Sequence, residues 1–78
     1  MSAEREAVIA WLLAHGFAER RGRQTSHRQF SRDGVLVTIP GHGPKDLSKK
    51  HLGMLLRQLE RAGFDRAAVR RELGVGGA

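Results

Sequence analysis

The sequence contains no cysteine, which excludes disulfide bonds and thiolate metal sites and gives no sign of an oxidising compartment. Aromatic residues make up only 5% of the chain, so a packed core has to be built mainly from Leu, Val, Ile and Ala. The longest apolar run, residues 7–14, is too short to span a bilayer and lacks the arrangement of a signal peptide. We therefore expect a cytoplasmic protein without a membrane segment.

Acidic residues are scarce relative to basic ones. The chain has 8 Asp and Glu against 14 Lys and Arg, which gives a formal net charge of +6 and a pI near 11.4. Most of the cations are Arg, whose planar fork of donors matches phosphate, so the surplus favours a nucleic-acid partner. General solubility is the alternative explanation of the same charge.

The length predicts one domain with a thin core. A globule of 78 residues buries only about 60 to 65% of the surface that its unfolded chain exposes. A hydrophobic content of 40% is nevertheless high enough to argue against disorder. We therefore expect a folded single domain.

The first helix is predicted over residues 2–15. Ser2 can cap it, and Glu4 suits the positive end of the helix dipole. Gly16 fits a left-handed position just after the helix, with Phe17 folding back in a Schellman close. Its apolar stripe consists of Val8, Trp11, Leu12 and His15, with Ile9 and Leu13 beside it.

Two more helices follow in the second half of the chain. One starts near Ser48 and ends at Gly63 and Phe64, which repeat the closing device of the first helix. Asp65 can then cap a short third helix over residues 66–73, before a glycine-rich tail. The core positions of the longer helix are Leu52, Leu55, Leu56 and Leu59.

A β-hairpin is predicted between the helices. VLVTI is short and β-branched, Asp33-Gly34 is a strong two-residue turn, and HRQFSR precedes it. An additional edge strand is expected over about residues 17–21. Counting outward from the turn pairs Arg32 with Val35, Phe30 with Val37, and Arg28 with Ile39 on one side of the sheet.

The same count places the polar side chains on the other side. There, Ser31 lies opposite Leu36, Gln29 opposite Thr38, and His27 opposite Pro40. His42 continues this parity if the chain stays extended. The sequence therefore predicts one apolar face that packs on the helices and one exposed polar face bordered by two histidines.

Four segments now resemble a known family: GF, RRGRQTSHRQF, DGVLVTIPGHGPKDL and RQLERAGF. Their order and spacing are similar to those of the HicA (YcfA-like) family of mRNA interferase toxins, over roughly residues 4–64. The most specific parts are Ser-His followed three residues later by an aromatic residue, and IPGHG after the next strand. The resemblance implies an α+β fold of the order α-β-β-β-α, like a double-stranded-RNA-binding domain.

In such a fold the three-stranded antiparallel sheet carries its helices on one face, and here a short C-terminal helix is added. The resemblance assigns residues 1–64 to the HicA-like domain and residues 65–78 to a helical extension with a frayed tail. It also implies an RNA-cleaving toxin that works without a metal ion or other cofactor and is silenced by a HicB-like antitoxin. We expect a monomer when free, and a hetero-oligomer with that antitoxin.

The resemblance carries the catalytic role to His27, with Ser26 and His42 in support. Metal-free cleavage needs a base for the 2′-hydroxyl proton and an acid for the departing 5′ oxygen, and an imidazole can do either near neutrality. The candidates for binding RNA are basic or polar residues near this site: Arg20, Arg21, Arg23, Arg28, Gln29, Lys45, Lys49 and Lys50. In the predicted register Arg28 falls on the helix-facing side and reaches solvent only at the sheet's edge.

The chain departs from the family pattern at three places. Thr25 stands where the family usually has Gly before Ser-His, SKKHL replaces a Gly-Thr at the start of the second helix, and residues 65–78 extend beyond the shared core. Two alternatives therefore stay open: a non-catalytic RNA-binding module of similar fold, and a basic protein-interaction domain.

The histidines also have simpler interpretations. Taken without the family, His27 is an ordinary strand histidine, and His42 a loop histidine that bonds the turn after Pro40. His15 and His51 lie on predicted helices, where a core-edge or solvated role is expected. A zinc site has little support, because the chain has no cysteine and no His-x-x-x-His spacing on a helix.

Overall fold

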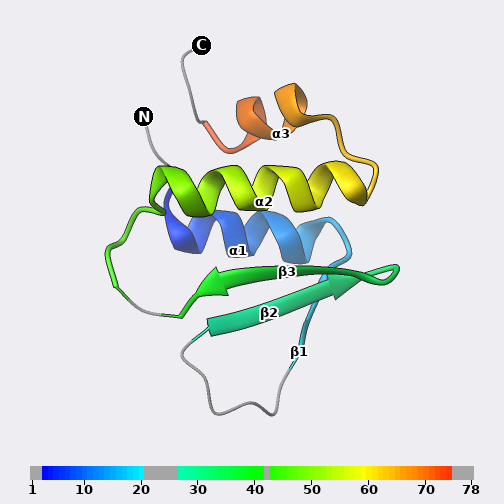
Figure 1. Ribbon diagram of the computed structural model, residues 1–78, viewed down its shortest axis with the longest axis horizontal. Coiled ribbons are helices and arrows are strands. Elements are labelled where there is room, and N and C mark those ends of the chain that lie inside the picture. The colour runs from blue at the N-terminus through cyan, green and yellow to red at the C-terminus, as the bar shows by residue number, and fades with distance from the viewer. Residues whose placement is uncertain (1–2, 21–26, 42, 75–78) are drawn as a thin grey trace.

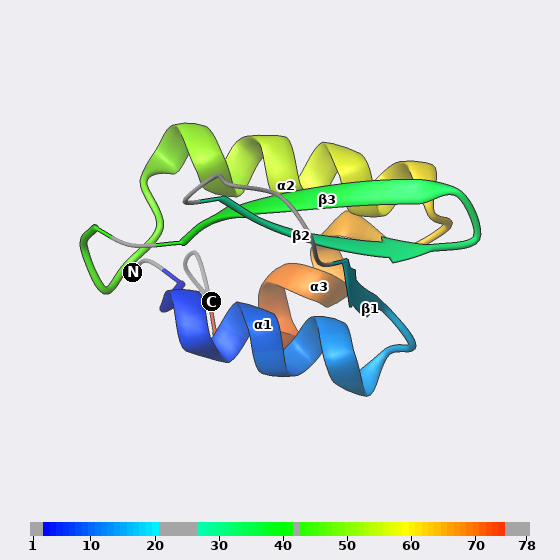
Figure 2. The same cartoon turned by 90° about the horizontal axis from the view of Figure 1, so that it is seen from below.

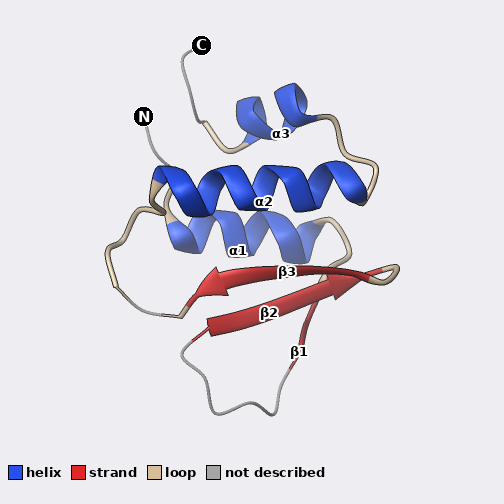
Figure 3. Ribbon diagram, in the orientation of Figure 1, coloured by secondary structure: helices blue, strands red, loops and turns tan. Residues whose placement is uncertain are grey.

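The computed structural model describes residues 3–20, 27–41 and 43–74, and the helices and strands of this part of the chain are shown in Figures 1 and 3. Their order confirms the predicted α-β-β-β-α arrangement with a short helix added at the C-terminus. The elements are α1 (Arg5–Ala14), β1 (Ala18–Arg20), β2 (His27–Arg32), β3 (Val35–Pro40), α2 (Lys49–Arg61) and α3 (Arg66–Glu72).

The strands form one antiparallel sheet in the order β1-β2-β3, and its register is the predicted one. Arg32 pairs with Val35 and His27 with Pro40, at the two ends of the hairpin. The turn between them has positive φ at both central residues, 50° at Asp33 and 82° at Gly34, as a type I′ turn requires. The twist of such a turn matches the twist of the strands it joins. Its length of two residues then fixes which residues of β2 and β3 face each other.

The helices cover one face of the sheet, as Figure 1 shows and Figure 2 confirms from below. Phe30 and Val37 point into this layer and are fully buried, and Ile39 is almost fully buried. They pack with apolar side chains of α1 and α2, such as Leu12 and Leu55, in one core cluster. The prediction of one apolar and one polar face of the hairpin is confirmed.

Both long helices end in the predicted Schellman close. Gly16 has φ 89° and Gly63 has φ 95°, a backbone region in which a side chain is strained. The amide of Phe17 donates to the Leu12 carbonyl, and the amide of Phe64 donates to that of Leu59, each over 3.0 Å. The glycines thus turn the chain back, and the phenylalanines that follow them pack in or against the core.

The predicted start of the first helix was wrong. The helix begins at Arg5, with Glu4 in the N-cap position and no side-chain cap, and the proposed cap Ser2 lies outside the described residues. The preceding residues are extended because they pair with the segment before α2. The Leu47 amide donates to the Ala3 carbonyl at 2.9 Å, and the Arg5 amide donates to the Lys45 carbonyl at 2.8 Å.

Other boundaries differ from the predictions by one residue. The edge strand begins at Ala18 because Phe17 is buried in the core, and its expected last residue, Arg21, lies outside the described residues. The third helix ends at Glu72, with Leu73 as its C-cap. Its predicted N-cap is confirmed, because the Asp65 carboxylate accepts from the Ala68 amide at 2.9 Å.

The C-terminal helix is fastened to α1 by a cluster of aromatic and polar contacts. The Trp11 indole donates to the Glu72 carboxylate at 2.7 Å, and the His15 ring stacks on Trp11 with centroids 3.9 Å apart. Phe64 meets the indole edge-on, and Val69 is buried in the common core. His15 thus has the core-edge role expected of it, and α3 belongs to the packed structure.

None of the described helices is both long and apolar enough to cross a membrane.

Two glycines, one inside α2 and one just after its end, predict opposite effects of the same substitution. Gly63→Ala forces a side chain into the left-handed region and lowers the free energy of unfolding by about 1 kcal/mol. Gly53→Ala lies in the helix interior, has ordinary φ and no neighbour within 4 Å, and stabilises by roughly 0.5–1 kcal/mol. Urea denaturation of both variants checks this, and two changes of the same sign contradict it.

The contribution of α3 to the core is tested by truncating its buried side chain. Val69→Ala removes packing in the common core and lowers the free energy of unfolding by about 2 kcal/mol. Arg71→Ala, at an exposed position of the same helix, changes it by less than about 0.5 kcal/mol. Thermal unfolding of the two variants decides the matter, and equal melting temperatures argue that α3 does not stabilise the domain.

Candidate functional site

The outer face of the sheet brings several of the predicted site residues together. His27 is the first residue of β2, is exposed, and pairs with Pro40 at the end of β3. Gln29 pairs with Thr38 on one side and with Arg20 of β1 on the other, so these side chains share the face turned away from the helices. Gln29 and Thr38 are half-buried, and Arg20 is exposed.

This arrangement follows from the hairpin. Because side chains alternate along a strand, burial of Phe30 obliges its neighbour Gln29 and the more distant His27 to face outward. The sheet therefore presents an accessible imidazole next to an amide and a guanidinium. Such a surface can exchange a proton and hold an anion at the same place.

Four other predicted site residues lie outside the described part of the chain. They are Arg21, Arg23, Ser26 and His42. Their roles stay predictions.

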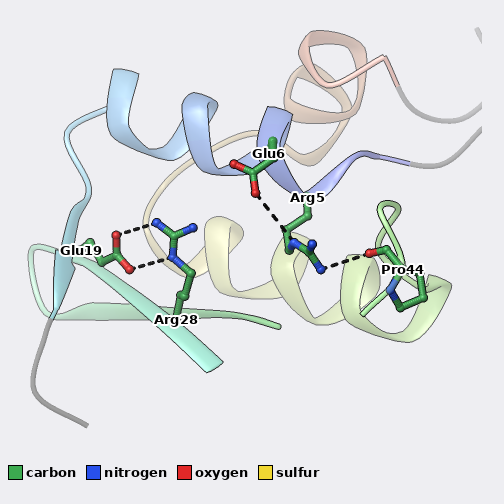
Figure 4. A network of polar contacts seen from close by, with 5 residues as sticks. All are labelled: Arg5, Glu6, Glu19, Arg28 and Pro44. Atoms are coloured by element: carbon green, nitrogen blue, oxygen red, sulfur yellow. Dashed lines mark hydrogen bonds and ion pairs between the residues drawn. The ribbon is translucent and has the colours of Figure 1, made fainter. Parts of the chain in front are cut away.

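Arg28 points to the other side of the sheet, as the register predicted. Figure 4 shows its guanidinium facing the carboxylate of Glu19. Its Nε and one terminal nitrogen each donate a hydrogen bond of 2.8 Å to that carboxylate. The hydrogen bonds that Arg28 donates to the Glu19 carboxylate raise the pKa of Arg28 above its ordinary value. The guanidinium also lies 5.6 Å from the ring centroid of Phe30, so it is held at the edge of the sheet.

The lysines of the predicted binding set surround the start of α2. Lys49 and Lys50 belong to its first turn and are exposed, and within the described residues neither forms an ion pair. Lys45 precedes the helix and lies 3.5 Å from the Glu4 carboxylate. Figure 1 shows that α2 begins at the same end of the molecule at which β3 stops, so the chain segment that carries these three lysines lies at that end.

A pocket of about 380 Å³ opens at this same end of the molecule. Ser48 caps α2 through its hydroxyl, which accepts from the His51 amide at 3.1 Å, and the same hydroxyl lies 2.9 Å from His51 Nδ1. The lining residues come from α1, the end of β3, the connecting segment and α2: Arg5, Pro40, Pro44, Asp46, Leu47, Ser48 and His51.

Sequence reasoning did not find this pocket. It assigned His51 a core-edge or solvated role and gave none to Arg5 or Asp46. The one available signal was the three-residue spacing of Ser48 and His51, which places both in the first turn of a helix. The walls come from segments far apart in the chain, so no local pattern marks them.

The pairing of Arg28 predicts a small, salt-dependent contribution to stability. Glu19→Gln lowers the free energy of unfolding by about 0.5 kcal/mol in dilute buffer, because the two side chains are 36% and 37% exposed and solvent screens them. Because the pKa of Arg28 is higher in the folded than in the unfolded protein, the ion pair stabilises the fold fully at any pH below the unfolded-state pKa. This stabilisation is lost only as the pH rises through the folded-state pKa. Both pKa values lie far above pH 9, so Glu19→Gln should lower the free energy of unfolding by the same amount at pH 7 and pH 9.

Glu60→Gln is the matched control, because Glu60 holds Arg66 through a single 2.9 Å contact instead of two. We expect a smaller effect from it, and both effects to shrink in 1 M salt. Urea denaturation at the two pH values measures them. An effect of Glu19→Gln that disappears at pH 9 contradicts the assignment.

The comparison with known families identifies the family of this chain. A family model described as the HicA toxin of bacterial toxin-antitoxin systems matches residues 5–61. No curated protein matches the chain. The family match takes in both long helices and the whole sheet, including His27, and ends where α2 ends, so that α3 lies beyond it. This chain therefore belongs to the HicA toxin family, the toxins of bacterial toxin–antitoxin systems.

Proposed function

We propose that this toxin is an endoribonuclease and that His27 supplies its acid–base group. The observation that carries the proposal is the exposed His27 at the end of the sheet's polar face, inside the region matched by the HicA model. Its neighbours on that face, Gln29 and Arg20, have the donors that an RNA phosphate needs.

The proposed reaction uses the RNA's own 2′-hydroxyl. An imidazole accepts the 2′ proton while the 2′ oxygen forms a bond to phosphorus, and the bond from phosphorus to the 5′ oxygen breaks. The departing oxygen takes a proton from an acid, which leaves a 2′,3′-cyclic phosphate and a 5′-hydroxyl. Cations stabilise the charge that develops on the phosphoryl oxygens, so the step needs no metal ion.

We propose that RNA binding depends on the combined positive charge at the end of the molecule where β3 stops and α2 begins. The cations there are exposed: Arg20 on the sheet, Lys45 in the segment before α2, and Lys49 and Lys50 in its first turn. Neutralising phosphates releases counterions, so affinity should fall steeply with salt. Arg28 takes part only to the extent that RNA competes with Glu19 for its guanidinium.

Membership of the family implies a cognate antitoxin, which we propose covers the outer face of the sheet. A protein bound there would prevent contact between RNA and His27. A complementary surface on the antitoxin should be acidic, because the toxin carries a net charge of +6.

The decisive variant is His27→Ala. Loss of an acid–base group reduces cleavage by about 10²–10⁴-fold, while binding of RNA changes little. Purified protein is incubated with labelled RNA in EDTA, and the cleavage rate and the chemistry of the new ends are measured. The expected products carry a cyclic phosphate and a 5′-hydroxyl.

His15→Asn is the control, because it removes a histidine that packs on Trp11 away from the sheet. It should cleave at nearly the wild-type rate once circular dichroism shows it to be folded. Equal cleavage by the wild type and His27→Ala removes the histidine from the mechanism. Binding without cleavage by any of them identifies the chain as an RNA-binding module instead.

A further inference from the structure

We infer that the pocket beside the start of α2 is a subsite for one RNA base that carries an exocyclic amine, such as cytosine or adenine. The inference rests on the proposed ribonuclease function and adds a specificity site to it.

The size and shape of the pocket suit a single flat group. Its volume of about 380 Å³ is at the small end of the range found for ligand sites, which is enough for one nucleoside and too little for a folded segment. Two proline rings, Pro40 and Pro44, and the side chain of Leu47 provide apolar walls. The His51 ring adds an aromatic surface of the kind on which unstacked RNA bases lie.

The polar groups of the pocket are held in place by the fold. Ser48 fixes His51 through contacts to both its amide and its ring. Arg5 donates to the Pro44 carbonyl at 3.1 Å, as Figure 4 shows, and its side chain is only 18% exposed. A guanidinium held in this way offers a planar surface for stacking, and the site has little side-chain freedom to lose on binding.

The pocket combines a cation, Arg5, with an acid, Asp46, and the acid favours a base over a phosphate at its own position. Asp46 is one of the lining residues, and within the described part of the chain its carboxylate forms no hydrogen bond or ion pair. A carboxylate repels phosphate but accepts hydrogen bonds from the exocyclic amine of a base. Uracil has a carbonyl where cytosine has this amine, so a site built around Asp46 should reject uracil.

The pocket is placed where a nucleotide next to the cut would reach it. Pro40 forms part of its wall, and the same residue pairs with His27 across the hairpin. A strand whose phosphate lies at His27 therefore has a neighbouring base within reach of the pocket. The lysines of the first turn of α2 are exposed nearby and can follow the backbone between the two sites.

The test compares two RNA pentamers of almost equal shape, five cytidines and five uridines, on the intact chain carrying His27→Ala. Phosphate contacts are the same for both, so the ratio of their affinities isolates the base. We expect the cytidine pentamer to bind about tenfold more tightly, and Asp46→Asn to bring the ratio close to one. Spectral shifts of Leu47 and His51 on addition of the cytidine pentamer locate the contact by NMR.

Asp33→Asn is the matched control. It makes the same change of charge in the hairpin turn, at the other end of the sheet, where a type I′ turn also accepts Asn. It should leave the ratio of affinities at its original value. A ratio that falls equally in both variants is an effect of net charge and overturns the inference, as does equal binding of the two pentamers or no binding of either.

Sequencing the ends of cleaved RNA separates this inference from the proposed function. With His27 intact, Asp46→Asn should still cut mixed-sequence RNA, but with a relaxed base preference beside the cut. An unchanged preference overturns the subsite and leaves the ribonuclease in place. Absence of cleavage by the wild type overturns the ribonuclease, while an Asp46-dependent preference for the cytidine pentamer still supports the pocket.

Discussion

The pairing of Phe30 with Val37 across the hairpin is the constraint on which the rest of the site depends. Both side chains are fully buried, and the two-residue turn fixes their partnership. A slip of one residue would expose them and turn Gln29 and His27 toward the helices. The apolar core thus holds the register, and the register places the polar face, which makes the exposed imidazole a consequence of packing.

The same constraint divides the basic residues into two groups. Arg28 lies between His27 and Gln29 in the sequence, yet the alternation of the strand sends it to the opposite side, where Glu19 binds it through two hydrogen bonds. Arg20 pairs with Gln29 and stays on the polar face. A surplus of cations is therefore a poor measure of a binding surface, because the fold first pairs some of them with acids.

Local chemistry accounts for the parts of the fold that could be predicted. The Asp33-Gly34 turn, the Ser48 and Asp65 caps and the Gly-Phe helix ends each involve residues within a few positions of one another, so the sequence displays them directly. The register and the exposure of His27 then follow by counting. The catalytic role expected of His27 came from the resemblance to the family, and counting along the strand placed the residue on the exposed face.

Long-range pairing accounts for the parts that were missed. The first helix starts late because Glu4 bridges to Asp46, which follows it by about forty residues, and no periodicity marks such a contact. The hydrogen bond from the Trp11 indole to the Glu72 carboxylate joins residues 61 positions apart, and no sequence pattern near either residue indicates it. The pocket has the same origin, since Arg5 and His51 line it together only because α1 and α2 begin at the same end of the molecule.

These long-range contacts connect the start of the chain to the site. The bridge of Glu4 with Asp46 brings the segment before α1 against the segment before α2, and the Arg5 side chain secures it through the Pro44 carbonyl. The position of Asp46 thus depends on Arg5, which lines the pocket with it, and on Glu4, which is not among the lining residues. A thin core leaves little other means of fixing a loop, so in this small toxin the proposed specificity site and the N-terminal segment form one structural unit.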